Sequence, residues 1–236
     1  MRLDVLTLFP DIFSGYLSQS LLKLAIERSL VEVSLHNIRD WATDKHRMVD
    51  DRPFGGGPGM VLKPEPVVEA VEAVQQMAES SGEGGPGHLI MLTPQGRRLD
   101  QEVVEELATY DRILLLCGRY EGFDQRISDL LEPDEISIGD YVLNGGEVAA
   151  MVIIDAIIRF VPGVLGDAQS NQRDSFTRGL FGHGKRVLEH AQYTRPREYR
   201  GKQVPEVLLS GNHQQVAQWR EQNSLERTTQ HRADLL

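Results

Sequence analysis

The sequence predicts an α/β protein with a mostly parallel sheet, helices on both faces of that sheet, and a small helical domain at the C-terminal end. The chain has 236 residues, 40% hydrophobic and 25% charged, which is an ordinary globular composition and enough to build a core. Strand-like and helix-like segments alternate up to about residue 165, and repeated βα units of this kind build parallel sheets. After Pro162 the apolar periodicity stops and polar residues dominate.

Five segments have strand patterns. One of them, Ile113–Cys117, is a continuous apolar run, which is typical of a central strand covered on both faces. Another, Val31–Ile38, alternates apolar and polar residues, as a half-buried strand does. In chain order the predicted strands are Arg2–Leu8, Val31–Ile38, His88–Leu92, Ile113–Cys117 and Glu135–Ile138.

The segments between these strands have helical spacing of apolar residues. Pro64 and Pro66 suit the first turn of a helix, and Asp100 is a suitable N-cap for another. The predicted helices are Ser18–Leu30, Pro64–Ala78, Asp100–Tyr110, Phe123–Leu131 and Gly146–Phe160, followed by two shorter ones near Asn212–Gln222 and Ser224–Gln230.

We therefore expect three parts: an α/β domain over residues 1–165, a linker over 166–195, and a basic helical domain over 196–236. Charge supports this division. Residues 1–169 carry 14 Lys and Arg against 28 Asp and Glu, whereas residues 170–236 carry 11 against 7. A local basic patch is what phosphate contacts need, because charge acts over only about 10 Å at ordinary salt. A solvated helical surface gives the same pattern.

The chain is expected to be cytoplasmic and without a membrane segment. Its single cysteine, Cys117, has no partner for an internal disulfide, which fits a reducing compartment. The most apolar stretch, Met151–Leu165, contains Asp155, Arg159 and Pro162 and falls short of the roughly 20 apolar residues of a membrane helix. The first ten residues lack the features of a secretory signal. We interpret Cys117 as a core residue.

Three successive strands run into glycine-containing loops with polar or aromatic side chains. These loops are TPQGR (93–97), GRYEG (118–122) and GDYVLNGGE (139–147). In an open α/β sheet, ligands bind beyond the carboxyl ends of the strands. One such loop is most simply a tight turn, but three in consecutive units predict a composite pocket.

Several tempting motifs lack the context that gives them meaning. GEGGPG (82–87) precedes a strand, and GGGPG (55–59) follows a polar stretch, so neither forms the strand–loop–helix arrangement of a dinucleotide fingerprint. A phosphate-binding G-K-[ST] sequence is absent. The group Asp44, His46, Asp50 and Asp51 has metal-binding chemistry, but a solvated polar loop is the better explanation, and we predict no metal site.

Two charged residues near the predicted linker are candidates for a functional role. Arg159 lies late in an apolar helix, where a charge is costly unless it is paired, binds a ligand or reaches solvent. Asp174, in the linker, is a carboxylate that can act as a general base or simply cap a helix. Neither residue alone decides between these interpretations.

Taken together, eight blocks of the chain resemble the TrmD-type tRNA (guanine-N1)-methyltransferases of the SPOUT class. They occur in order over almost the whole chain, and GRYEG and SIGDYVLNGGE are the most specific. The blocks are DVLTLFP (4–10), PFGGGPGM (53–60), CGRYEGFDQR (117–126), SIGDYVLNGGE (137–147), PGVLG (162–166), DSF (174–176), YTRP (193–196) and VPEVLLSGNH (204–213).

The resemblance implies a deep trefoil knot, which general topology rules would reject, and S-adenosylmethionine as methyl donor. It neither requires nor excludes assistance by Mg²⁺. The residues implied to bind the cofactor lie in the three loops or at the strand ends before them: Leu92, Pro94, Gly118, Tyr120, Glu121, Gly122, Ser137, Ile138, Gly139, Asp140, Tyr141, Val142, Leu143, Gly145 and Gly146. Ala149 stands where many members have proline, and Asn144 is assigned no role.

The implied reaction is methylation of N1 of the guanosine on the 3′ side of the anticodon in tRNA. Asp174 matches the family's proposed base, and Arg159 matches the arginine thought to stabilise charge toward O6. The resemblance also implies a homodimer with active sites shared between subunits. Candidate RNA contacts are His183, Lys185, Arg186, Arg195, Arg197, Arg200 and Lys202.

Two other functions stay open at this point. One is a SPOUT-class methyltransferase that acts on a different RNA. The other is a non-catalytic RNA-binding relative that keeps the scaffold.

Overall fold

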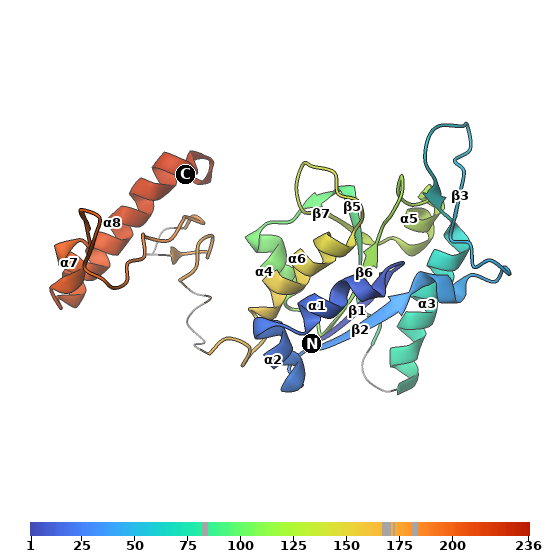
Figure 1. The fold of residues 1–236 in the computed structure, drawn as a ribbon, viewed down its shortest axis with the longest axis horizontal. Helices are drawn as coiled ribbons and strands as arrows, with labels where there is room; N and C mark the ends of the chain where they lie inside the picture. Colours follow the sequence, from blue (N-terminus) through green and yellow to red (C-terminus); the bar gives the residue numbers. More distant parts are fainter. Residues whose placement is uncertain (82–84, 167–170, 172, 181–183) are drawn as a thin grey trace. The chain divides into compact units, whose positions relative to one another are not determined.

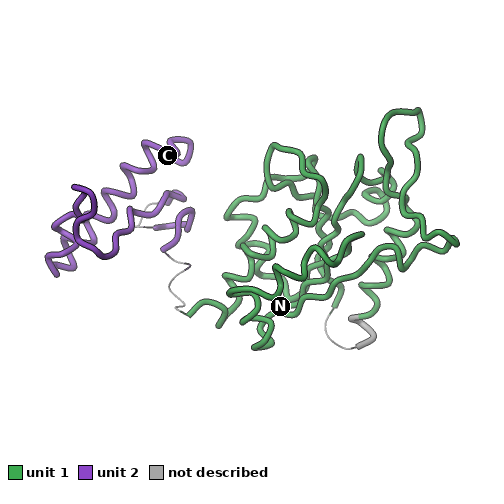
Figure 2. Tube along the Cα trace, viewed as in Figure 1, with its two compact units in different colours: residues 1–166 green, residues 167–236 purple. Residues whose placement is uncertain are grey.

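A computed structural model of the chain describes residues 1–236 except 82–84, 167–170, 172 and 181–183 (Figure 1). The chain divides into two compact units, Met1–Gly166 and Asp167–Leu236 (Figure 2). Each unit is described by itself. None of the described helices is long and apolar enough to cross a membrane.

The first unit is built on a parallel sheet of five strands, which confirms the predicted fold class. The strands lie in the order β2-β1-β6-β5-β7, and every neighbouring pair is parallel. Their bounds are β1 Arg2–Thr7, β2 Glu32–Asn37, β5 His88–Arg98, β6 Arg112–Cys117 and β7 Asp134–Ser137. The apolar strand β6 is central, as its sequence predicts, and all six of its residues are buried.

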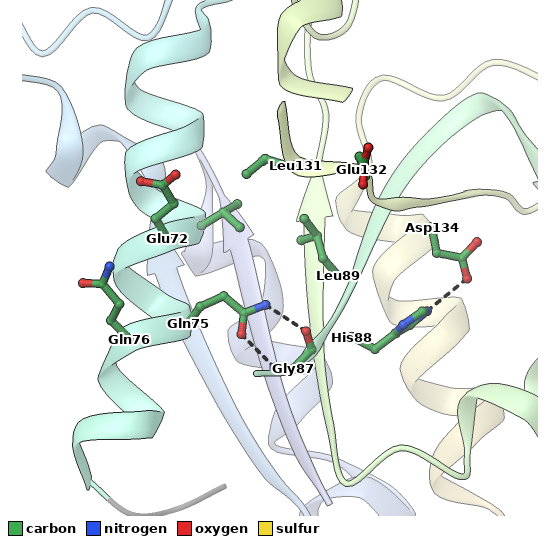
Figure 3. A pocket seen from close by; sticks show the side chains of 10 residues that line it. Glu72, Gln75, Gln76, Gly87, His88, Leu89, Leu131, Glu132 and Asp134 are labelled. Atoms are coloured by element: carbon green, nitrogen blue, oxygen red, sulfur yellow. Dashed lines mark hydrogen bonds and ion pairs between the residues drawn. The ribbon is translucent and has the colours of Figure 1, made fainter. Parts of the chain in front are cut away.

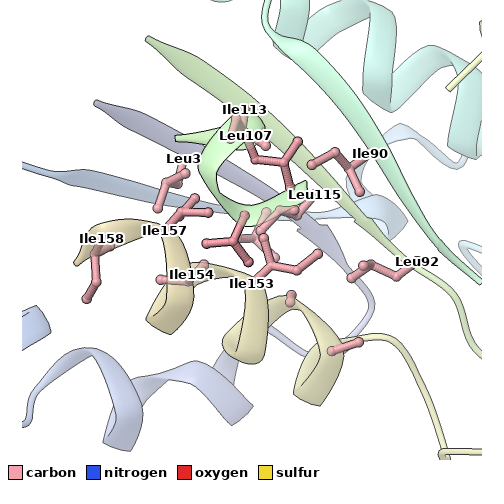
Figure 4. Packing of buried hydrophobic residues seen from close by; sticks show 14 of the residues in the cluster. Leu3, Ile90, Leu92, Leu107, Ile113, Leu115, Ile153, Ile154, Ile157 and Ile158 are labelled. Atoms are coloured by element: carbon pink, nitrogen blue, oxygen red, sulfur yellow. The ribbon is translucent and has the colours of Figure 1, made fainter. Parts of the chain in front are cut away.

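Successive residues of β6 point to opposite faces of the sheet and so build two cores. Ile113 and Leu115 pack on one face with α6 (Glu147–Ile158) and α4 (Gln101–Leu107), as Figure 4 shows. Leu114 and Leu116 pack on the other face with α3 (Pro64–Ser81) and α5 (Gln125–Leu131). Helices therefore cover both faces, as predicted.

The predicted helix Ser18–Leu30 is present as α2, Ser20–Glu27, and is shorter at both ends than predicted. A short helix, α1 over Ser14–Leu17, precedes it and was not predicted. The two helices are separated at Gln19, whose backbone is extended, and Ser20 has a left-handed φ of 52°. The apolar stripe of α2 does pack in the core through Leu22 and Ala25, so the helical periodicity was read correctly.

Strand β5 is longer than predicted, because it continues through the segment expected to be a loop. It pairs with β7 up to Leu92, loses register over the next four residues, and pairs again from Arg97. The segment TPQGR is thus a bulged continuation of the strand. Gly96 allows β5 to approach β7 again, since a Cβ at this position would collide with the backbone of Glu135 and Ile136.

Short elements outside the sheet were not predicted. In the first unit they are η1 (Pro10–Phe13), η2 (Ile38–Trp41) and the antiparallel pair β3 (Asp50–Asp51) with β4 (Val61–Leu62). The glycine-rich segment 55–59 lies between β3 and β4, and the side chain of Phe54 beside it is almost fully exposed. This segment is a hairpin connection and no part of a strand–loop–helix motif.

The second unit contains one long helix where two short ones were predicted. Helix α8 spans His213–His231 without a break. Ser224 and Thr228 lie one turn apart and are both fully buried, and their hydroxyl groups bond to the backbone of Leu188. These two polar residues therefore form a packing face of the helix. The remaining elements are β8 (Glu198–Tyr199), β9 (Lys202–Gln203), α7 (Glu206–Leu209) and η5 (Ala233–Leu235).

Residues 166–195 were predicted to be a linker, whereas the division between the units falls directly after Gly166. Described residues of this stretch pack within the second unit. Val187 is fully buried, and the amide of Ala191 donates to the side chain of Asn223 on α8 at 2.8 Å. The absence of periodicity reflects an irregular chain held by hydrogen bonds to a helix.

A buried carboxylate at the amino end of β1 makes the first unit sensitive to acid. Asp4 is fully buried and is contacted by Arg112 at 2.9 Å, His36 at 2.9 Å and Arg2 at 3.2 Å. Burial opposes ionisation of Asp4, but hydrogen bonds from His36, Arg112 and Arg2 outweigh it and hold its pKa below the ordinary value. The unfolded chain therefore binds a proton at Asp4 more readily than the folded chain does.

We expect the free energy of unfolding to fall as the pH decreases below about 4, because Asp4 contributes stability above its unfolded pKa and loses it as the pH falls through the folded pKa. Chemical denaturation from pH 7 to pH 3 measures this loss. In Asp4→Asn the protein is expected to be less stable at neutral pH and to depend less on pH. An unchanged acid dependence in that variant would assign the effect to other carboxylates.

Candidate cofactor-binding site

A cavity of about 340 Å³ lies where the carboxyl ends of β5, β6 and β7 meet. Three segments that follow or extend these strands line it, from residues 93–95, 118–122 and 137–146. This is the composite pocket that the three glycine-containing segments predict. Its volume is within the usual range of small-molecule sites.

The residues predicted to bind the cofactor come together here with one exception. Asp140 is not among the lining residues. Those that line the cavity are Leu92, Pro94, Gly118, Tyr120, Glu121, Gly122, Ser137, Ile138, Gly139, Tyr141, Val142, Leu143, Gly145 and Gly146.

The cavity is also lined by residues that were not predicted. Ala149, on the first turn of α6, and Asn144, which was assigned no role, both line it. The others are Met91, Thr93, Gln95, Arg119, Phe123, Gln125, Ser128 and Ile136. Most are immediate neighbours of predicted residues, so extending each loop by one or two positions would have found them. Gln125 and Ser128 lie on α5, and no loop pattern marks them.

Two walls of the cavity touch each other through backbone. The amide of Gly146 donates to the carbonyl of Gly118 at 2.8 Å. A Cβ on Gly146 would lie 2.8 Å from Cα of Cys117, so only glycine allows this approach. The close contact fixes the point where α6 begins relative to the end of β6.

Glycines at the rim leave the backbone accessible. Gly122 and Gly139 have left-handed φ angles of 114° and 147°, which glycine adopts at little cost. Gly139 is tied to Ser137, whose hydroxyl oxygen accepts from the glycine amide at 3.3 Å. Tyr141 turns back over the same loop, and its hydroxyl donates to the carbonyl of Ile138 at 3.2 Å. The first part of loop 139–146 is therefore held by local hydrogen bonds.

Cys117 lies beneath the cavity and is fully buried. Burial, with a further contribution from the charge of Glu147, raises the pKa of its thiol well above the ordinary value. The thiol therefore stays protonated at neutral pH and does not act as a nucleophile. Its packing in the α6 core agrees with the interpretation made from the sequence.

The two predicted catalytic residues are not among those that line the cavity. Arg159 is half-buried and caps the carboxyl end of α6 in the first unit. Asp174 is half-buried and belongs to the second unit, where its carbonyl accepts from the amide of Thr177 at 3.2 Å. The backbone beside it is held firmly, since the Phe176 amide donates to the carbonyl of Val187 at 2.8 Å.

The predicted RNA contacts that the structure describes all lie in the second unit. His183 lies outside the described residues. Arg195 and Arg197 line a second cavity of about 430 Å³ together with Tyr193 and Arg220. Arg186 has an internal role as well, because it donates to the carbonyl of Phe176 at 2.8 Å. Basic groups thus gather around a defined hollow of this unit.

A larger hollow, of about 690 Å³, lies at the opposite, amino ends of β5 and β7 (Figure 3). Its polar groups bond to one another. The side-chain amide of Gln75 exchanges two hydrogen bonds with the backbone of Gly87 at 2.8 and 2.7 Å, and His88 pairs with Asp134 at 3.1 Å. This hollow therefore has the character of a structural furrow, and we assign the ligand site to the carboxyl edge.

Within the part of the chain that the structure describes, no three His, Cys, Asp or Glu side chains come together as a metal site. In the segment 44–51, both carboxylate oxygens of Asp44 accept backbone amides, from His46 and Met48, each at 2.8 Å. Asp44 therefore shapes a turn.

A parallel sheet covered by helices on both faces, with a glycine-lined cavity at the carboxyl ends of three strands, defines an open α/β protein of the class whose ligands bind at that edge. The whole chain, residues 1–236, matches the family model of tRNA (Guanine-1)-methyltransferase TrmD. The chain belongs to this family.

Curated relatives match this chain over more than nine tenths of their own length. The chain is 62% identical to a tRNA (guanine-N(1)-)-methyltransferase of Rhodopirellula baltica, covering 100% of this chain and 94% of that one. It is 54% identical to a protein of the same name from Geobacter sulfurreducens and 53% identical to one from Geobacillus kaustophilus. In both cases the match covers 100% of this chain and 91% of the relative.

Proposed function

We propose that this protein transfers the methyl group of S-adenosylmethionine to N1 of the guanosine on the 3′ side of the anticodon in tRNA. The observation that carries the proposal is the cavity at the carboxyl edge, which unites three segments that also match the family's motifs. The family membership supplies the reaction class.

The cavity fits a nucleoside-sized ligand. Apolar side chains such as Leu92, Ile138 and Leu143 offer a surface for a flat base, and the glycines bring backbone amides and carbonyls within reach. Local hydrogen bonds hold the start of loop 139–146, and bonds with Arg119 and Gly118 hold its end, which lowers the cost of ordering the loop on binding. When bound, S-adenosylmethionine supplies an electrophilic methyl group.

The chain's own task is to make N1 nucleophilic. N1 of guanine carries a proton at neutral pH, so a base must remove that proton as the new bond forms. We assign this role to Asp174 and assign stabilisation of the charge that moves toward O6 to Arg159. Positioned acid–base assistance of this kind contributes about 10²–10⁴ in rate.

The second unit is proposed to hold the tRNA. Its basic side chains around the cavity of Tyr193, Arg195 and Arg197 suit phosphate contacts, and the acidic first unit need not touch the RNA backbone. The target guanine must leave its stack to reach the methyl group, as other base-modifying enzymes require.

We also propose the remaining family features: a deep trefoil knot, a cytoplasmic location and a homodimer with shared active sites. Membership of the TrmD family over the whole chain supports the knot. The single buried Cys117 suits a reducing compartment. For the dimer, a helix face in the first unit provides support.

This face joins the outer side of α6 to η1, which contacts it. Val148 and Val152 lie one turn apart on α6 and are 52% and 41% exposed, and Phe9 and Ile12 at η1 are exposed to a similar extent. Large apolar side chains gathered in this way mark interaction surfaces.

If two subunits meet through this face, Val148→Asp combined with Val152→Asp is expected to convert the dimer to a monomer, because burying two carboxylates at an interface is costly. Sedimentation velocity measures the change. Leu130→Asp is the control, because it places the same charge at an exposed apolar position on α5. A dimer that persists in the double variant would place the interface elsewhere.

The function is tested with tRNA transcripts that differ only at the base 3′ of the anticodon. We expect methylation of the transcript with guanosine there and none of its counterpart with adenosine, and mass mapping should place the methyl group on that guanosine. Equal methylation of both transcripts would favour a methyltransferase of another RNA position. Binding of tRNA without methyl transfer would favour a non-catalytic relative.

A further inference from the structure

Beside the cavity, Arg119 and Glu147 form a buried ion pair that the sequence analysis did not predict. Arg119 follows β6 directly, and Glu147 opens α6. The Nη2 atom of Arg119 lies 2.9 Å from Oε2 of Glu147, and its Nε donates to Oε1 at 3.1 Å. Glu147 is only 1% exposed. The contact therefore combines one hydrogen bond, from Nε to Oε1, with a close approach of opposite charges at Oε2.

The end of β1 provides a third anchor for the pair. The hydroxyl of Thr7, which is fully buried, donates to Oε1 of Glu147 at 2.7 Å and accepts from the amide of Phe9 at 3.0 Å. The ring of Phe9 lies under the guanidinium of Arg119, 4.5 Å from its centre. Because β1 belongs to the core of the sheet, Glu147 and Arg119 are tied to a rigid element.

Arg119 also reaches the loop that precedes Glu147. Its Nη1 donates to the carbonyl of Asn144 at 3.2 Å, and its backbone forms an isolated bridge with Gly145. A Cβ on Gly145 would collide with the Arg119 side chain. One side chain thus joins segment 118–122 to segment 139–146, and these are two of the three walls of the cavity.

Burial makes the geometry of this pair strict. Oε2 of Glu147 has no hydrogen bond of good geometry, so Arg119 is the cation that compensates it. A buried ion pair adds little net stability compared with apolar packing, but loss of one partner leaves a costly uncompensated charge. The main effect of the pair is therefore to position the two walls of the cavity. Segments 118–122 and 139–146 must stay at the separation that keeps the Arg119 guanidinium against the Glu147 carboxylate.

We propose that Arg119 and Glu147 are positioning residues that set the separation of two walls of the cofactor cavity, and so its affinity for S-adenosylmethionine. This inference rests on the proposed function for the identity of the ligand. Neither side chain is assigned a part in the methyl transfer itself. Arg119 and Glu147 act through the loops that they join.

The test uses the full-length protein and two conservative variants, Glu147→Gln and Arg119→Lys. Glu147→Gln keeps the shape of the side chain and removes its charge, and Arg119→Lys keeps the charge and removes the fork. We expect each to raise the Kd for S-adenosylmethionine, measured by calorimetry, by about tenfold, or roughly 1.4 kcal/mol. In steady-state assays KM for S-adenosylmethionine should rise while kcat at saturation changes much less.

Asp4→Asn is the matched control. Asp4 is also a buried carboxylate paired with an arginine, Arg112, but this pair lies at the other end of β6. The control should lose comparable stability and keep its Kd for S-adenosylmethionine. If Asp4→Asn weakens binding as much as Glu147→Gln does, or if Glu147→Gln binds as the unaltered protein does, the positioning role is overturned.

Hydrogen exchange separates this inference from the proposed function. Without any ligand, amides of 118–122 and 139–146 should exchange faster in Glu147→Gln and Arg119→Lys than in Asp4→Asn. Unchanged exchange in both variants would overturn the positioning role. Faster exchange together with no binding of S-adenosylmethionine by the unaltered protein would retain the positioning role and reject the ligand.

Discussion

Replacement of Asp174 by alanine is expected to lower the rate of methyl transfer to tRNA by about 10²–10⁴-fold. N1 of guanine cannot attack while it holds its proton, and this variant has no carboxylate to accept it. Single-turnover assays with saturating S-adenosylmethionine and transcript tRNA measure the effect directly. Unaltered activity in the variant would remove Asp174 from the mechanism.

Binding of S-adenosylmethionine to the same variant should be nearly unchanged, because Asp174 is not among the residues that line the cavity. The local backbone should also survive the change. The amide of Phe176 bonds to Val187, and the hydroxyl of Ser175 accepts from the amide of Glu189 at 3.0 Å, without help from the carboxylate.

Asp174→Asn supplies the matched comparison. It keeps the size and polarity of the side chain but cannot act as a base, so its activity should be as low as that of Asp174→Ala. Substantial activity in Asp174→Asn alone would indicate that the side chain orients the RNA by hydrogen bonding. A normal affinity for tRNA in both variants would confine the effect to the chemical step.

Gly96→Ala is expected to weaken both the fold and the cofactor site. A Cβ at this position would collide with the backbone of Glu135 and Ile136, which cannot move without separating β5 from β7. We expect the free energy of unfolding to fall by about 2 kcal/mol or more. For a domain of this size, that loss corresponds to a fall in Tm of roughly 4–8 °C. Calorimetry measures both the Tm and the accompanying loss of affinity for S-adenosylmethionine.

Gly15→Ala is the control for this substitution. A Cβ at Gly15 meets nothing within 4 Å, and the residue lies in helix α1, where alanine is favoured over glycine. Its Tm should therefore stay the same or rise slightly. An unperturbed Tm in Gly96→Ala would mean that the bulge of β5 adapts to a side chain.

The sheet was predictable because strong local patterns agreed with the global arrangement. The apolar run Ile113–Cys117 had to be covered on both faces, and it is the central strand. The strand predicted over Val31–Ile38 is β2, at the edge of the sheet, although its residues are almost all of intermediate exposure and do not alternate between buried and exposed. Since the carboxyl ends of neighbouring strands in a parallel sheet lie at one edge, the three glycine-containing segments were enough to predict the position of the cavity.

The errors have a common physical origin, which is tertiary contact overriding local preference. Pro94 and Gly96 indicate a turn, yet the chain regains its pairing with β7 after a bulge. Ser224 and Thr228 are poor helix formers, yet burial against Leu188 places them within a continuous helix. Such contacts join residues far apart in the chain, so no window of sequence reveals them.

The site was predictable in its loops and not in its side-chain partners. Motif resemblance identified most of the cavity lining, because those residues are contiguous in the sequence. The pair Arg119 and Glu147 joins positions 28 residues apart. Each lies inside one of the motifs, and nothing in either motif indicates that the two side chains meet. Residues of α5 that line the cavity were missed for the same reason.

The arginines that flank β6 have a consequence for how the sheet assembles. Arg112 meets Asp4 at one end of the strand, and Arg119, just past the other end, meets Glu147. If β6 paired with its neighbours one residue out of register, every β6 side chain would turn to the opposite face. Both guanidinium groups would then be separated from their carboxylates. An out-of-register sheet therefore loses two ion pairs in addition to the correct burial of the β6 leucines. Both losses favour the native register during folding.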